Sequence, residues 1–172
     1  MSLENGNYVL IGYMGAGKST VGKALAKETN KKFVDTDELI VKQMNLSIND
    51  IFAKYGEAYF RDLETKLIEN LLIHVTDCVI SCGGGLPMKE ENRPLLKKLG
   101  KVIYLNVSEN DILKRLKNDK TRPLLQGPKE EVKDKIHNMI ELRDPVYRET
   151  ADVIIKTGRM NVQDVVGKII KC

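Results

Sequence analysis

A glycine-rich stretch near the start of the chain carries residues well suited to chemistry. It reads GYMGAGKST (12–20) and combines three glycines with one lysine and, at its end, the hydroxyls of a serine and a threonine. Gly12, Gly17, Lys18 and Ser19 satisfy GxxxxGK[ST], in which glycines let backbone N–H groups approach phosphate oxygens. We expect Lys18 to reach the β- and γ-phosphates of a nucleoside triphosphate and Ser19 to ligate Mg²⁺.

The flanking sequence supplies the context that this motif requires. Residues 7–12 (NYVLIG) predict a buried strand and residues 18–30 predict a helix. The positive end of that helix would face the same anion. The candidate nucleotide-binding residues of the loop are Gly15, Ala16, Gly17, Lys18, Ser19 and Thr20.

The motif alone does not name a reaction, because GTPases, ATPases and small-molecule kinases share it. The chain has no NKxD element for guanine, and its third predicted strand ends VISCGGG without the acid usual in motor and transporter ATPases. A carboxylate for Mg²⁺ must therefore come from elsewhere. Asp35, near the end of a second predicted strand (31–37), is the candidate; its alternative role is the N-cap of a helix.

Composition restricts the class of protein. The chain has 172 residues, 42% apolar and 30% charged, which suits one globular domain. Three cysteines without a CxxC pair predict neither a disulfide framework nor a zinc site. A net charge of +4 without a basic stripe does not favour nucleic acid. The absence of a long apolar run or signal peptide favours the cytoplasm and no membrane partner.

Strand and helix signals alternate along the whole chain. This order predicts an α/β three-layer sandwich with a five-stranded parallel sheet, which binds ligands at the carboxyl ends of its strands. The strands are expected at 7–12, 31–37, 78–85, 101–107 and 151–157. The helices are expected at 18–30, from 48 (capped by Ser47), and near 57–75, 89–98, 109–117, 130–149 and 162–171; a polar break covers 118–131.

Six segments follow one another in order along nearly the whole chain: GYMGAGKSTVGKALA (12–26), FVDTDELI (33–40), IFAKYGEAYFRDLE (51–64), SCGGGLP (81–87), TRPLL (121–125) and RDPVYRETAD (143–152). Together they resemble the shikimate kinases. The resemblance implies a nucleoside monophosphate kinase-like P-loop fold: one domain (1–172), with a substrate-binding segment (about 35–64) and a lid (about 118–129). It also implies transfer of the γ-phosphate of ATP to the 3-hydroxyl of shikimate, in aromatic amino-acid (chorismate) biosynthesis.

The resemblance also implies roles in substrate binding. Arg61 and Arg143 would bind the shikimate carboxylate, for which a planar guanidinium is well shaped. Asp37 would orient the attacking hydroxyl and could accept its proton. Glu64, one helical turn after Arg61, could hold that guanidinium in place. The backbone of the glycine triplet would approach the substrate ring; its members are Gly83, Gly84 and Gly85.

Three more arginines are implied at the nucleotide. Arg122, in the lid, would place positive charge on the transferring phosphoryl group. Arg115 would stack against adenine, and the loop 156–161 with Arg159 would complete that pocket. Val162 stands where many relatives have proline, a departure from the family pattern at this pocket.

Two other functions remain open from the residues. One is another small-molecule P-loop kinase, of the gluconate or nucleoside monophosphate type. The second is a degenerate nucleotide-binding domain with a regulatory role. Such a domain typically loses catalytic residues, whereas Lys18, Asp37 and Arg122 are all present. By resemblance we expect an enzyme that acts as a monomer.

Overall fold

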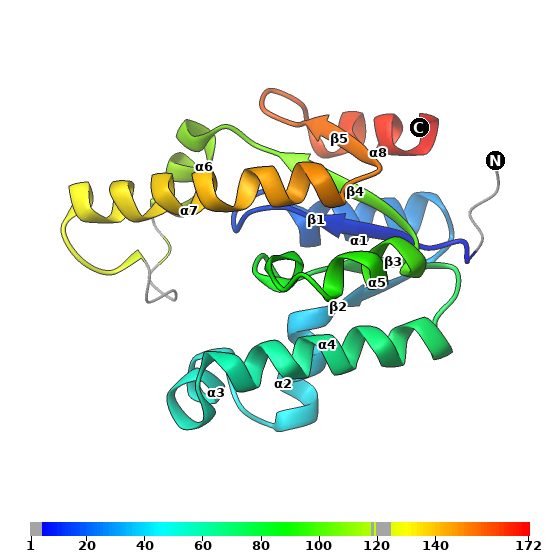
Figure 1. Ribbon diagram of the computed structural model, residues 1–172. Helices are drawn as coiled ribbons and strands as arrows, with labels where there is room; N and C mark the ends of the chain where they lie inside the picture. Colours follow the sequence, from blue (N-terminus) through cyan, green and yellow to red (C-terminus); the bar gives the residue numbers. More distant parts are fainter. Residues whose placement is uncertain (1–4, 118, 120–124) are drawn as a thin grey trace.

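The computed structural model describes residues 5–117, 119 and 125–172. Its centre is a five-stranded sheet in the order β2-β3-β1-β4-β5, with neighbouring strands parallel. Helices cover both faces of this sheet (Figure 1). The predicted α/β class and three-layer architecture are confirmed.

The strands are short and mostly apolar, as expected where helices cover both faces of a sheet. In the register of the sheet, Leu10 lies beside Ser81 on one side and Ile103 on the other. The first and third strands therefore end side by side; Gly12 follows the first directly, and Gly83 follows the third after Cys82. The strands are β1 (Tyr8–Ile11), β2 (Lys32–Asp35), β3 (Cys78–Ser81), β4 (Lys101–Asn106) and β5 (Val153–Lys156).

Eight α-helices and one 3₁₀ helix lie among the described residues. They are α1 (Lys18–Glu28), α2 (Thr36–Met44), α3 (Ile48–Tyr55), α4 (Glu57–His74), the 3₁₀ helix η1 (Leu86–Met88), α5 (Asn92–Leu99), α6 (Glu109–Leu116), α7 (Lys129–Thr150) and α8 (Val162–Lys171). Helices α1 and α8 pack together on one face, and α4, α5 and α7 cover the other. In the part of the chain that is described, no helix combines the length and apolar content needed to cross a bilayer.

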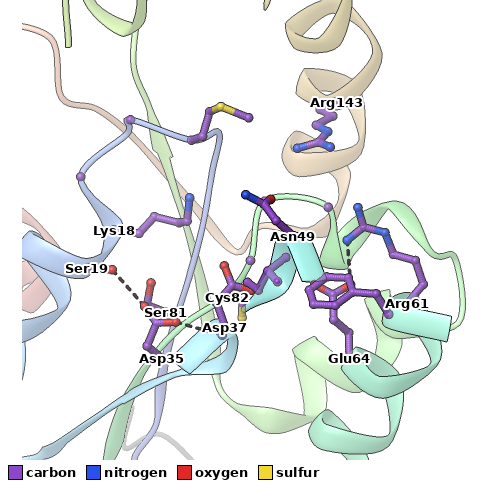
Figure 2. A pocket seen from close by; sticks show the side chains of 18 of the residues that line it. Lys18, Ser19, Asp35, Asp37, Asn49, Arg61, Glu64, Ser81, Cys82 and Arg143 are labelled. Carbon is purple, nitrogen blue, oxygen red and sulfur yellow. Dashed lines mark hydrogen bonds and ion pairs between the residues drawn. The ribbon is translucent and has the colours of Figure 1, made fainter. Parts of the chain in front are cut away.

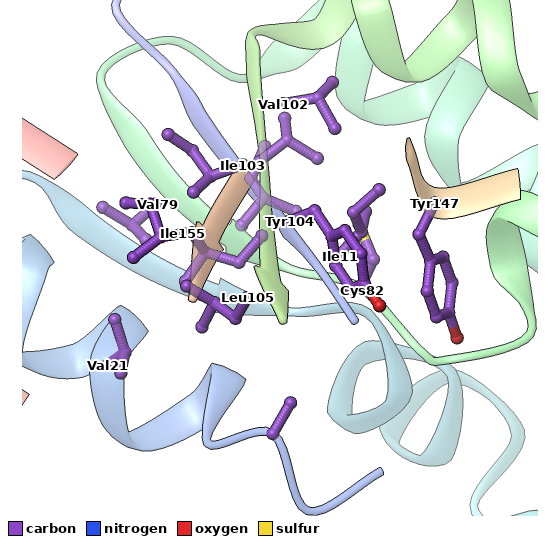
Figure 3. Close-up of a cluster of buried hydrophobic side chains, with 14 of the residues drawn as sticks. Ile11, Val21, Val79, Cys82, Val102, Ile103, Tyr104, Leu105, Tyr147 and Ile155 are labelled. Atoms are coloured by element: carbon purple, nitrogen blue, oxygen red, sulfur yellow. The ribbon is translucent and has the colours of Figure 1, made fainter. Parts of the chain in front are cut away.

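The main hydrophobic core lies between the sheet and its helices (Figure 3). A second, smaller cluster of Ile40, Ile51 and Phe60 joins α2, α3 and α4. Leu67 packs against both clusters and so connects this three-helix unit to the sheet. The unit carries Asp37 and Arg61, so its packing determines where these two side chains stand.

The prediction of a strand over 31–37 was wrong at its end. Strand β2 stops at Asp35, and Asp37 lies in the first turn of α2, a helix that the sequence analysis did not predict. Asp35 has extended dihedrals (φ −114°, ψ 122°) and caps α2, so no loop residue separates strand from helix. The helix expected near 89–98 is α5, which begins at Asn92; the preceding 3₁₀ helix η1 was not predicted.

Candidate active site

A cavity of about 580 Å³ opens at the carboxyl ends of β1, β2 and β3. Figure 2 shows Lys18 and Ser19 on one side of it and Arg61, Glu64 and Arg143 on the other. Segments far apart in the sequence thus meet around one space, at the position where parallel sheets bind ligands. The predicted residues among its lining are Gly15, Gly17, Lys18, Ser19, Thr20, Asp35, Asp37, Arg61, Glu64, Gly83, Gly84, Gly85 and Arg143.

The loop between β1 and α1 has the backbone that phosphate binding needs. Gly15 (φ 77°) and Gly17 (φ 88°) adopt left-handed conformations that other residues rarely take. No side chain caps α1, and its first turn holds no acidic residue, so its first N–H groups are left for an anion. Lys18 Nζ donates to the carbonyls of Gly12 (2.8 Å) and Tyr13 (3.0 Å), which holds its ammonium group over the loop.

Ser19 and Asp35, the two residues expected at Mg²⁺, lie in contact. The Ser19 hydroxyl donates to Asp35 Oδ2 at 3.0 Å. The other carboxylate oxygen, Oδ1, accepts from the backbone N–H groups of Asp37 (2.9 Å) and Glu38 (3.2 Å). Asp35 is therefore the N-cap of α2 and a neighbour of Ser19 at the same time.

Arg61 and Glu64 form an ion pair at the far wall of the cavity. Arg61 Nη1 lies 2.8 Å from Glu64 Oε2, and Nη2 lies 3.3 Å from Glu57 Oε1. This confirms the contact expected between Glu64 and the Arg61 guanidinium. Burial opposes the charge of Arg61, but its carboxylate partners leave the pKa of Arg61 raised.

Glu64 is fully buried, and among the described residues its second oxygen, Oε1, has no hydrogen-bond partner. Burial raises the pKa of Glu64 to about 7, against the opposing effect of Arg61, and the charge of Asp37 adds to the rise. A carboxyl group thus stands between its protonated and ionised states at neutral pH, one helical turn from a cation that faces the cavity.

Asp37 lies against the glycine triplet. A Cβ atom placed on Gly83 would come within 2.7 Å of Asp37 Oδ1 and 3.0 Å of Glu64 Oε1, so a larger residue there would displace the Asp37 carboxylate. The Gly83 N–H donates to the hydroxyl of Thr36 at 3.0 Å. This bond connects the glycine triplet, called the glycine turn below (Gly83, Gly84 and Gly85), to the start of α2. The side chain of Asp37 therefore lies beside the backbone of Gly83.

Arg143 reaches the cavity from α7, on the opposite side of the glycine turn. Its guanidinium lies 5.7 Å from the centre of the Tyr13 ring, a cation–π distance. A Cβ atom on Gly84 would lie 3.1 Å from Arg143 Nη1, and one on Gly85 would collide with the Arg61 guanidinium. Two guanidinium groups from different helices therefore flank one short backbone segment.

A second cavity, of about 300 Å³, adjoins the phosphate loop between α1, α6 and α8. Arg115 lines it and donates from Nη1 to the carbonyl of Gly15 at 2.9 Å. Ala16, Thr157 and Val162 also line it, which fits the expected adenine pocket. Arg159 is exposed and lines neither cavity.

The predicted lid falls partly outside the described residues. Positions 118 and 120–124 are not described, and they include Arg122. Its role at the phosphoryl group therefore stays a prediction.

The sequence analysis missed several residues of the site. Thr36, between the two aspartates, anchors the glycine turn, and Tyr147 contacts the same turn from α7. The one available signal for Tyr147 was its place four residues after Arg143, on the same helical face. Apolar or amide residues that also line the main cavity are Met14, Ile48, Asn49, Phe52 and Phe60.

Comparisons with known proteins identify a family for this chain. A family model described as shikimate kinase matches residues 14–172. A shikimate kinase of Sulfurihydrogenibium sp. is 45% identical over 164 residues, covering 95% of each chain. One from Chromobacterium violaceum is 44% identical over 165 residues, covering 96% of this chain and 88% of that one. The structure of Acinetobacter baumannii shikimate kinase in complex with shikimate matches with a TM-score of 0.89 at 38% identity, covering 96% of this chain and 90% of the other.

Proposed function

This chain belongs to the shikimate kinase family, and from that premise we propose that it transfers the γ-phosphate of ATP to the 3-hydroxyl of shikimate. The products would be shikimate 3-phosphate and ADP, in the route to chorismate and the aromatic amino acids. One observation carries the assignment: a single cavity joins a phosphate-binding loop to two guanidinium groups and the Asp37 carboxylate. This arrangement suits a phosphate donor and a hydroxylated carboxylate acceptor.

The nucleotide would lie across the phosphate loop. Backbone N–H groups of the loop and of the first turn of α1 would bind phosphate oxygens, and Lys18 would move from its carbonyl partners to the β- and γ-phosphates. Adenine would occupy the second cavity beside Arg115. Exposed Arg159 would reach the nucleotide only by moving, so its contribution is the weakest of this set.

Mg²⁺ fits the pair formed by Ser19 and Asp35. A hydroxyl and a carboxylate oxygen 3.0 Å apart are hard oxygen donors of the kind that Mg²⁺ prefers. Because Asp35 Oδ1 is committed to the cap of α2, Oδ2 is the oxygen that would face the ion. When bound, the ion would supply positive charge next to the phosphates.

Shikimate would bind with its carboxylate between Arg61 and Arg143 and its ring over the glycine turn. Charge-assisted hydrogen bonds from two guanidinium groups fix both the position and the direction of a carboxylate. The opposite side of the ring would then meet Asp37, which would orient the 3-hydroxyl toward the γ-phosphate. As phosphoryl transfer proceeds, Asp37 would accept the hydroxyl proton.

The chain would act as one domain. Segment 35–64 would bind the acceptor, and segment 118–129 would close over the nucleotide, bringing Arg122 to the phosphoryl group and excluding water.

We also propose that the protein works as a cytoplasmic monomer, because one chain carries all the residues assigned here. Sedimentation of the purified protein would test the last point.

An acceptor panel tests the reaction. Purified protein with Mg²⁺ and ATP is given shikimate, gluconate, AMP or no acceptor, and ADP release is followed. We expect rapid release with shikimate only. Turnover with gluconate or AMP would leave the phosphate loop assigned but overturn the roles of Asp37, Arg61 and Arg143. ATP binding without turnover on any acceptor would favour a regulatory domain.

A further inference from the structure

Tyr147 joins the hydrophobic core to the candidate active site. It lies on α7 four residues after Arg143, and its side chain is 1% exposed. Its ring packs at 5.1 Å from the ring of Tyr104 (Figure 3). Its hydroxyl leaves the apolar cluster and donates to the carbonyl of Gly84 at 2.6 Å. The ring therefore serves the core, whereas the oxygen reaches the glycine turn.

The same hydroxyl lies near the Arg143 guanidinium. Arg143 precedes Tyr147 by one turn of α7, and its positive charge acts on the phenol. A Cβ atom on Gly84 would lie 3.1 Å from Arg143 Nη1 and 3.6 Å from the Tyr147 oxygen, so both groups cover the same backbone atom. Burial raises the pKa of Tyr147 despite the opposing charge of Arg143, so the phenol keeps the proton that it donates.

The bond to Gly84 also orients the next N–H group. The carbonyl of Gly84 and the N–H of Gly85 belong to one planar trans peptide, in which they point in opposite directions. Since the carbonyl points at Tyr147, the N–H of Gly85 points away from it. Arg61 packs over Gly85, so this peptide lies between the two guanidinium groups.

We propose that the hydroxyl of Tyr147 is a positioning group for acceptor binding: it holds the Arg143 guanidinium and the Gly84–Gly85 peptide in the arrangement that receives the substrate carboxylate. The proposal rests on the carboxylate-binding role proposed above for Arg143. Tyr147 does not touch the reacting atoms, and it acts through the groups that it orients.

Tyr104 provides a matched control. It belongs to the same buried aromatic pair and is 4% exposed, and its hydroxyl also makes one hydrogen bond, to Asp144 Oδ1 at 2.8 Å. That bond leads to another residue of α7 and not to the glycine turn. Tyr104→Phe and Tyr147→Phe therefore each remove one buried phenol oxygen from the same part of the core, and only the second removes the hydrogen bond to the glycine turn beside Arg143.

The test compares steady-state kinetics of the wild type, Tyr147→Phe and Tyr104→Phe, with thermal unfolding of each. We expect Tyr147→Phe to raise the KM for shikimate about three- to tenfold, because it removes one hydrogen-bonding group. Its kcat and its KM for ATP should stay within about twofold of the wild type. Tyr104→Phe should leave all three constants within about twofold of the wild type. It should lower the melting temperature by about as much as Tyr147→Phe does, because each variant loses one buried hydrogen bond.

A double-mutant cycle tests whether the effect passes through Arg143. In an Arg143→Lys background, which lacks the planar guanidinium, Tyr147→Phe should change the KM for shikimate far less than it does alone. Full additivity would overturn the proposal, as would an unchanged KM in Tyr147→Phe, equal effects of the two phenylalanine variants, or failure of Tyr147→Phe alone to fold. Absence of shikimate-dependent turnover in the wild type would instead contradict the proposed function.

Discussion

The two carboxylate oxygens of Asp35 have different roles: one caps a helix, and the other lies in the candidate active site. Oδ1 accepts two backbone N–H groups at the start of α2, and Oδ2 accepts the Ser19 hydroxyl. The sequence left two roles for this residue, a helix N-cap or a ligand of Mg²⁺. The structure shows the cap at Oδ1, and Oδ2, which accepts from Ser19, is the oxygen that faces the phosphate loop.

Asp37 is the residue on which the proposed chemistry depends most. Asp37→Asn keeps the size of the side chain but removes the negative charge and the capacity to accept a proton. We expect kcat with shikimate to fall about 10²–10⁴-fold, as for loss of a general base, while the affinity for ATP stays the same. The measurement is steady-state kinetics together with nucleotide binding.

Glu38→Gln is the matched control for this prediction. Glu38 is exposed on the same turn of α2, and its side chain does not line the cavity. It should therefore keep wild-type kinetics. Equal turnover by Asp37→Asn and Glu38→Gln would remove Asp37 from the mechanism.

Glu64 gives the protein a titration near neutral pH. Its pKa is raised from 4.5 to about 7, chiefly by burial. Between these values the folded protein binds this proton more tightly than the unfolded chain does. The contribution of Glu64 to the free energy of unfolding is therefore fully present below pH 4.5 and is lost as the pH rises through about 7.

Glu64→Gln should abolish this part of the pH dependence. From pH 4.5 to 8, the wild type should lose about 2–3 kcal/mol of unfolding free energy relative to Glu64→Gln. Urea unfolding at a series of pH values measures the difference. Glu57→Gln, which removes the exposed partner of Arg61, should keep the wild-type slope. Parallel pH profiles for the wild type and Glu64→Gln would show that Glu64 is ionised throughout.

Among individual residues, the sequence predicted those that belong to a motif and missed those that act only through contacts. Lys18, Ser19 and Arg61 were identified by motif or resemblance, and they line one cavity. Thr36 and Tyr147 escaped because their role depends on which backbone atom of the glycine turn they reach. That pairing joins residues 47 and 63 positions apart, and no local pattern encodes it.

Two helices that carry site residues begin in the same way. Ser47 caps α3 and Ser108 caps α6; each hydroxyl accepts the N–H of the aspartate three residues later and bonds to its carboxylate at 2.7 Å. Helix α3 lines the main cavity, whereas α6 carries Arg115 to the second one. The two caps therefore support helices that line different cavities.

Replacing each cap separately tests this division. Ser47→Ala and Ser108→Ala should each lower the free energy of unfolding by about 1 kcal/mol. Ser47→Ala should raise the KM for shikimate more than that for ATP, and Ser108→Ala should do the reverse. Each variant is the control for the other, and identical effects on both KM values would show that the caps stabilise the fold without distinguishing the two sites.

The elements themselves were largely predictable. Helix α8 has the predicted bounds, and Ser47 caps α3 as expected. Helix α2 was missed because the extended backbone of an N-cap residue also continues a strand, so the segment FVDTD carries both signals at once. The sequence did not predict η1, which follows the glycine turn, because a short 3₁₀ helix has too few residues to show a periodic pattern of apolar side chains.

For the molecule as a whole, alternation of strands and helices was enough to predict a parallel sheet. The strand order β2-β3-β1-β4-β5 was not predicted, because it depends on long-range packing. This order places β1 between β3 and β4, so that the phosphate loop and the glycine turn leave neighbouring strands at the same edge. That adjacency lets one small chain hold a nucleotide and an acceptor in contact.

The most direct test of this account is the position of the phosphate in the product. The protein is incubated with Mg²⁺, ATP and shikimate, and the product is examined by phosphorus–proton correlation NMR. We predict a single phosphorylated product in which phosphorus couples to the proton on carbon 3 of the ring, with one ADP formed for each molecule. Phosphate on another hydroxyl, or ADP and inorganic phosphate without a phosphorylated acceptor, would contradict the placement of the 3-hydroxyl at Asp37 between the two arginines and the phosphate loop.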